Sequence, residues 1–109
     1  MSKEDGFYLR HMYDAICQIE LYIAVLAYEE FLRNKLVQDA VIRQLEIIGE
    51  ASKNISGDLK SRYPETPWKD IAGMRDKLAH HYFGVDMTAV WETATQDLPV
   101  LKTTIAGLL

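Results

Sequence analysis

Residues 9–26, L-R-H-M-Y-D-A-I-C-Q-I-E-L-Y-I-A-V-L, repeat large apolar side chains at spacings of three and four residues. On a helix of about 3.6 residues per turn, this spacing gathers those side chains into one stripe. The polar side chains of Arg10, Asp14, Gln18 and Glu20 fall largely outside the stripe. Its members are Leu9, Met12, Ile16, Ile19, Ile23 and Leu26. The stretch therefore predicts a long amphipathic helix that must be covered along one face.

Apolar residues recur at the same spacing in residues 37–55, 71–82 and 87–108, and shorter helical turns are expected at residues 28–32 and 59–63. No segment shows the convincing alternation of apolar and polar residues that a half-buried strand would have. Four principal helices joined by short connections predict an all-α fold. We expect an antiparallel up-and-down four-helix bundle with short extra helical turns.

Capping residues and prolines mark the ends of the later helices. Thr66 can cap the third principal helix, and Pro67 suits its first position because proline lacks the N–H that would be unpaired there. Gly84 can end the same helix in a left-handed conformation. Asp86 is the expected N-cap of the last helix, and Pro99 should kink that helix because it interrupts the hydrogen-bond ladder.

The composition is ordinary for a soluble globular protein in a reducing compartment. Cys17 is the single cysteine, and no apolar run reaches the roughly 18 residues of a membrane span, so we expect a cytoplasmic protein without membrane association. Twelve Lys and Arg against sixteen Asp and Glu give a net charge of −4, which argues against broad, salt-driven nucleic-acid binding. A length of 109 residues fits one domain, residues 1–109, and the long apolar stripe of the last helix favours a homodimer.

Metal and nucleotide-loop chemistry is not indicated. A di-iron site in a helical bundle needs Glu-x-x-His on two helices, and no Glu precedes a His by three positions here. His80 and His81 are adjacent, so they point about 100° apart on a helix and cannot chelate one ion as an i, i+4 pair could. The sequence also has no glycine-rich phosphate loop. We therefore expect neither a metal ion nor another cofactor.

Residues 75–84, R-D-K-L-A-H-H-Y-F-G, bring an arginine, an aspartate, two histidines and a tyrosine close together in the sequence. Arg75 offers a fixed fork of donors for a phosphate, and a histidine such as His80 can take or give a proton near neutral pH. These two groups suffice for metal-free RNA cleavage by a deprotonated 2′-hydroxyl. The simpler alternative is a helix end that carries cations because they interact favourably with the helix dipole.

The geometry of one straight helix does not bring this pair together. Arg75 and His80 are five residues apart, which is roughly 140° around the helix axis. Either the helix loosens before Gly84, or two copies meet across a twofold axis and share a site, and we favour the second arrangement. Glu46 and Glu50, one turn apart on the second principal helix, could orient Arg75, although solvated helix charges explain them as well.

Three blocks of sequence resemble the HEPN superfamily, and specifically the HepT-like toxins. The first block is R-x4-H-x-Y at Arg75, His80 and Tyr82. The second is V-I-R-Q-L-E-I-I-G-E-A at residues 41–51, and the third is P-W-K-D-I-A-G-M-R at residues 67–75. All three occur in a short helical chain, and the resemblance covers most of it.

The resemblance implies a HEPN-like bundle that dimerises and acts on RNA as a metal-independent ribonuclease. Arg75 and His80 would be the catalytic pair, with Asp76 as a supporting polar residue, whereas His81 receives no role. It also implies the toxin of a type VII (HepT/MntA) toxin–antitoxin system. There, an MntA-like nucleotidyltransferase antitoxin neutralises the toxin by transferring AMP from ATP to the motif tyrosine, here Tyr82. The alternative is a non-catalytic nucleotide-binding or scaffold module that partners a nucleotidyltransferase.

Overall fold

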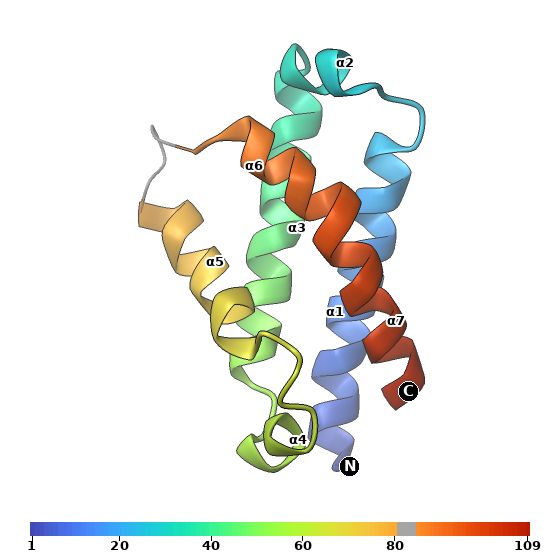
Figure 1. The fold of residues 1–109 in the computed structure, drawn as a ribbon, viewed down its shortest axis with the longest axis vertical. Coiled ribbons are helices and arrows are strands. Elements are labelled where there is room, and N and C mark those ends of the chain that lie inside the picture. The colour runs from blue at the N-terminus through green and yellow to red at the C-terminus, as the bar shows by residue number, and fades with distance from the viewer. Residues whose placement is uncertain (81–84) are drawn as a thin grey trace.

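The computed structural model describes the backbone of residues 1–80 and 85–109, and the side chains of residues 1–74 and 85–109 (Figure 1). The described chain is helical and contains no strand, so the predicted all-α fold is confirmed. Its elements are α1 Lys3–Ile23, α2 Tyr28–Leu32, α3 Lys35–Lys53, α4 Gly57–Arg62, α5 Trp68–His80, α6 Met87–Glu92, a π-helical turn η1 Thr93–Asp97, and α7 Leu98–Leu108.

The principal helices alternate in direction along the long axis of the molecule. Helix α3 packs against α1 on one side and α5 on the other and runs antiparallel to both (Figure 1). Helix α7 follows α6 and η1 back along the bundle and packs against α1. This is the antiparallel up-and-down arrangement that the four apolar stripes predicted.

The hydrophobic core lies between α1, α3 and α7, and α2 closes one end of it. The expected stripe of α1 is buried over four of its six members, from Leu9 to Ile19. The largest fully buried apolar side chains are Phe31, Leu9, Met12, Ile16, Ile19, Leu45, Ile48, Ile105 and Val41. Burying one such side chain stabilises the fold by roughly 1.5–3 kcal/mol, so these residues dominate the packing energy.

Helix α1 is shorter than its apolar stripe predicts, because it ends at Ile23 and leaves Leu26 beyond it. The N–H of Leu26 donates to the carbonyl of Ile23 at 3.0 Å in a turn. The next residue, Ala27, is extended, and its N–H donates to the Glu30 carboxylate at 2.8 Å. This cap of α2 competes with continuation of α1, and the chain turns so that Phe31 reaches the core.

Side-chain caps fix most of the other helix starts. Ser2, Asn34 and Ser56 each accept a hydrogen bond from a backbone N–H three residues later, which satisfies one of the unpaired donors of α1, α3 and α4. Asp86 caps α6 as predicted, since its carboxylate accepts from two first-turn N–H groups at 2.9 and 3.4 Å. For α5, no hydrogen bond to the Thr66 hydroxyl is found among the described residues. The N–H of Trp68 donates instead to the backbone carbonyl of Thr66 at 2.8 Å.

A π-helical turn precedes Pro99, a form of helix disturbance that the expected kink did not specify. Residues 87–108 are helical, but the turn before Pro99, η1, is π-helical, and the N–H of Leu98 donates to the carbonyl of Thr93. Proline cannot donate to the carbonyl four residues earlier, and its ring clashes with that carbonyl in a regular α-helix. The wider π turn takes up this clash and lets α7 continue without a break.

Candidate active site

The motif helix α5 is anchored at its first turns. Trp68 and Ile71 are buried in the core, and the indole N–H of Trp68 donates to the backbone carbonyl of Tyr63 at 3.0 Å. Helix α3 is the main packing partner of α5 (Figure 1). The start of the helix is therefore held both by hydrophobic contact with α3 and by a tie to the preceding loop.

A buried carboxylate fixes the loop before α4, the helix that directly precedes α5. Asp5, only 4% exposed, accepts hydrogen bonds from the N–H of Ser56 at 2.8 Å and from its hydroxyl at 2.6 Å. Burial by itself would raise the pKa of the Asp5 carboxyl, but the hydrogen bonds from Ser56, together with smaller contributions from Ser2 and the positive N-terminus, lower the pKa below its usual range. Asp5 is thus a charged clamp between the start of α1 and the start of α4.

The predicted catalytic residues lie on the second half of α5 and beyond it. Arg75, Asp76 and His80 belong to the helix by their backbone, whereas their side chains are not among those described. Tyr82 and His81 lie outside the described residues, as does the expected helix end at Gly84.

The helix does not loosen between Arg75 and His80, because α5 is helical from Trp68 to His80. The two Cα positions are therefore separated by about 140° around the axis and about 7.5 Å along it. The helix is thus regular as far as His80, and the expected loosening before Gly84 stays a prediction, since residues 81–84 lie outside the described part of the chain. A site shared between two copies of the chain stays a prediction.

Glu46 and Glu50, the suggested orienting residues, lie on α3, the helix that packs against α5. Glu46 pairs with Arg43 on its own helix, with 3.6 Å between Oε2 and Nη1. Contact of the Glu46 and Glu50 carboxylates with Arg75 stays a prediction, because the Arg75 side chain is not among those described.

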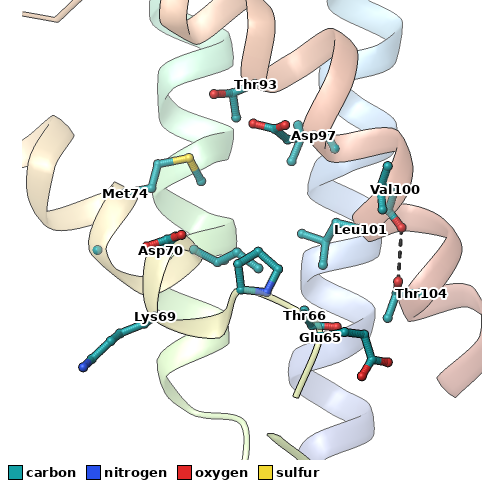
Figure 2. Close-up of a pocket in the computed structure, with 14 residues that line it drawn as sticks. Glu65, Thr66, Lys69, Asp70, Met74, Thr93, Asp97, Val100, Leu101 and Thr104 are labelled. Carbon is teal, nitrogen blue, oxygen red and sulfur yellow. Dashed lines mark hydrogen bonds between the residues drawn. The ribbon is translucent and has the colours of Figure 1, made fainter. Parts of the chain in front are cut away.

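An open groove of about 770 Å³ runs between the start of α5 and the η1–α7 segment (Figure 2). Apolar side chains from both helices line it, including Ile71 and Met74 of α5 and Leu101 of α7. Among the residues whose side chains are described, three carboxylates also line the groove, those of Glu65, Asp70 and Asp97, and one basic side chain does so, that of Lys69. The groove reaches Met74, the neighbour of Arg75, and its charge is unfavourable for RNA phosphates.

A smaller depression of about 350 Å³ lies on the surface where α1 and α3 meet. Phe7 is 58% exposed there, and its ring meets that of His11 edge-on, with the centroids 4.5 Å apart. Arg43 and Asn54 contribute polar groups from α3. We did not predict this site; the i, i+4 placement of Phe7 and His11 off the apolar stripe is the signal that could have indicated it.

The described residues offer no group of three His, Cys, Asp or Glu side chains that could bind a metal ion. Within the same part of the chain, no helix is both long and apolar enough to cross a membrane.

Comparison with known proteins assigns the sequence to a family. A sequence model of the family described as "Ribonuclease HepT-like" matches residues 12–107, a region that includes all of α5 and the R-x4-H-x-Y block. The chain belongs to the HepT-like family. The family resemblance suggested by the three sequence blocks is thereby confirmed. In this HepT-like chain, helix α5 with Arg75, Asp76 and His80 lies within the matched region.

Curated relatives of this HepT-like chain agree with that assignment. A protein of Thermococcus cleftensis named "Probable ribonuclease HepT" is 50% identical over 102 residues, 94% of this chain and 93% of that protein. A protein of Methanocaldococcus jannaschii, named as a candidate RNase, is 57% identical over 75 residues, 69% of this chain and 65% of that protein. A candidate RNase of Caldanaerobacter subterraneus is 37% identical over 102 residues, 94% of this chain and 91% of that protein. No solved structure gave a significant match.

Proposed function

We propose that this HepT-like protein is a metal-independent endoribonuclease and the toxin of a type VII (HepT/MntA) toxin–antitoxin system. The family match across residues 12–107, which includes the R-x4-H-x-Y block, is the observation that carries the proposal. The unbroken helix α5 supports it, because Arg75 and His80 then lie on one rigid element. Relatives that are named as ribonucleases support the same class of reaction.

In the proposed reaction, neutral His80 accepts the proton of a ribose 2′-hydroxyl, and the oxygen attacks the adjacent phosphorus. The bond from phosphorus to O5′ breaks as the bond to O2′ forms. The products are a 2′,3′-cyclic phosphate and a 5′-hydroxyl, whose oxygen takes up a proton. Arg75 stabilises the charge on the non-bridging oxygens, and Asp76 supports the arginine. Because Arg75 and His80 diverge on α5, the site is shared by the two copies of a homodimer.

The test is cleavage of a labelled RNA by purified protein in excess EDTA. Wild-type protein should cleave and leave cyclic phosphate ends, whereas Arg75→Ala and His80→Ala should each abolish cleavage. Arg62→Ala and His11→Ala are matched controls, because they remove the same side-chain types from exposed positions on α4 and α1 and should leave activity intact. Cleavage that survives both motif substitutions, or that requires a metal ion, would contradict the proposal.

Neutralisation by AMP transfer to Tyr82 is the second part of the proposal. The phenol oxygen of Tyr82 would attack the α-phosphorus of ATP, pyrophosphate would leave, and the tyrosine would carry AMP. The added anion beside Arg75 would repel the RNA backbone and compete for the arginine. Co-expression with an MntA-like nucleotidyltransferase should raise the intact mass of the protein by whole AMP units. Tyr82→Phe should prevent the increase while Tyr8→Phe does not, and an unchanged wild-type mass beside an active partner would count against it.

A non-catalytic nucleotide-binding or scaffold module is the second candidate, favoured by the net charge of −4 and the acidic groove beside α5. A scaffold of this kind would form a tight complex with a nucleotidyltransferase. It would show no RNA cleavage, and its expression would not arrest growth. The EDTA cleavage assay therefore separates the two candidates.

A further inference from the structure

The groove between α5 and α7 is built from parts that the proposed RNA chemistry does not use. Its lining is largely apolar and includes the buried side chains of Ile71 and Leu101. Val100, which is 69% exposed, also lines the groove on the α7 side (Figure 2). The volume of about 770 Å³ lies within the range of roughly 300–1,000 Å³ that is typical of binding pockets. Water covers this apolar surface at an energetic cost that a bound apolar group would remove.

The carboxylates around the groove are not neutralised within the described part of the chain. Glu65, Asp70 and Asp97 are exposed, and none of them forms an ion pair or a side-chain hydrogen bond with another described residue. They come from the loop before α5, from α5 itself and from η1, so they approach the groove from both sides (Figure 2). A bound group that carried positive charge at its margins would meet all three.

Thr66 places a hydroxyl group in the groove lining. The residue is only 8% exposed, but no buried side-chain oxygen or nitrogen of the described residues lacks a partner, so the unpaired Thr66 hydroxyl is reached by water in the open groove. A hydroxyl in this position is costly to enclose unless it is paired, so a ligand that fills the groove should supply a donor or an acceptor for it.

The charge distribution decides between the classes of occupant. RNA is disfavoured because its phosphates would face Glu65, Asp70 and Asp97. A second copy docked through the same groove is also disfavoured, because among the described lining residues each groove carries three carboxylates against one lysine, so two such surfaces would meet with the same sign of net charge. The remaining class of occupant is a segment of another protein that has apolar side chains on one face and lysine or arginine beside them. Its apolar face would contact the apolar lining, and its basic side chains would pair with the carboxylates around it. A groove between two helices suits a helical segment.

We propose that the α5–α7 groove is a docking site for an amphipathic, basic helix of another protein. Apolar side chains of that helix contact Ile71, Met74 and Leu101, and its basic side chains pair with Asp70 and Asp97. The contact begins on the first turns of α5 and extends to Met74, the residue before Arg75, and it does not depend on ribonuclease activity.

The test uses an amidated leucine–lysine peptide of about 14 residues, which forms roughly 21 Å of amphipathic helix. Its binding to the full chain is measured by fluorescence anisotropy and mapped by the NMR shifts of backbone amides. The peptide should bind and shift the amides of residues 65–74 and 93–104. A matched peptide with glutamate in place of lysine should not bind.

Charge reversal at the groove provides the sharper comparison. Asp70→Lys with Asp97→Lys should weaken lysine-peptide binding about tenfold, because two attractive pairs become repulsive. Asp14→Lys with Asp58→Lys makes the same change in net charge at exposed positions outside the groove lining and should change the affinity by less than about twofold. Equal losses in the two variants, shifts that map elsewhere, or binding of the glutamate peptide would overturn the proposal. Circular dichroism checks that each variant remains folded.

Discussion

Replacing Asp5 by asparagine removes the charge from the clamp that joins α1 to α4. The Asp5 carboxylate accepts two hydrogen bonds from Ser56, at 2.8 and 2.6 Å, across 51 positions of sequence. Ser56 in turn caps α4 by accepting from the N–H of Leu59 at 3.2 Å. The substitution keeps one side-chain oxygen but replaces the other with an amide group, and it removes the negative charge that strengthens both bonds.

The expected loss follows from these two contacts. A hydrogen bond to a charged acceptor contributes about 1.5–3 kcal/mol, and asparagine can retain part of each bond with the Ser56 N–H and hydroxyl. We therefore expect the free energy of unfolding to fall by about 1.5–3 kcal/mol at pH 7. For a chain of this length, the melting temperature should drop by about 6–12 °C. Guanidinium unfolding followed by circular dichroism measures the difference.

The pH dependence gives a second test of the same contact. Because the folded-state pKa of Asp5 is lowered, its charged form stabilises the fold fully above the unfolded pKa of about 3.9. That contribution is lost as the pH falls through the lower folded-state value. The difference in stability between wild type and Asp5→Asn should thus be constant from about pH 7 to pH 5 and shrink below about pH 4.

Glu4→Gln is the matched control, since it removes one negative charge from an exposed position in the same first turn of α1. It should cost no more than about 0.3–1 kcal/mol through the helix dipole. A loss for Asp5→Asn equal to that of Glu4→Gln would refute the clamp. A stability difference between wild type and Asp5→Asn that stays constant as the pH falls from 5 to below the folded-state pKa of Asp5 would also refute it.

Two further predictions follow from the described contacts and from the motif. Gln38→Ala should lower the free energy of unfolding by about 1–3 kcal/mol, because the buried Gln38 amide donates to the last two carbonyls of α2 at 2.9 and 3.1 Å. Thermal melts measure this loss, and Gln18→Ala on the exposed side of α1 is the control. Equal parts of Arg75→Ala and His80→Ala protein, unfolded together and refolded, should recover about a quarter of wild-type RNA cleavage. Half of the dimers would then be mixed, with one of two shared sites intact. No recovery would argue against a site shared between copies.

Local patterns predicted the helices because burial of an amphipathic stripe depends on spacing alone. The stripe of α1 is buried from Leu9 to Ile19, and Asp86 caps α6 as expected. The predicted end of α1 was three residues too late, because Leu26 continues the apolar spacing although the helix ends at Ile23. The hydrogen bond from the Ala27 N–H to the Glu30 carboxylate starts α2 instead of extending α1. Periodicity carries no information about that competing hydrogen bond.

Features formed by distant residues could not be predicted from the sequence. From the sequence, Asp5 is an ordinary acidic residue in a first helical turn, and Asp70 and Asp97 are ordinary solvent-exposed charges. Only the fold places Asp5 against Ser56 and places Asp70 and Asp97 along the groove. Pro99 is an intermediate case, because the missing N–H predicted a disturbance in the helix. Whether the helix kinks or widens depends on how the preceding turn packs, and the structure shows a π-helical turn.

Helix α5 combines two surfaces with opposite electrostatic requirements. Its first turns border a groove rimmed by carboxylates, while its last turns carry the Arg75 and His80 of the motif. Asp70 and Arg75 are five residues apart, about 7.5 Å along the axis, which is less than a Debye length at physiological salt. In the proposed reaction, RNA phosphates that approach Arg75 would therefore be repelled by the carboxylates on the groove side. A basic protein segment experiences the reverse preference. One helix can in this way separate a substrate from a docked partner by charge, even though the two surfaces adjoin.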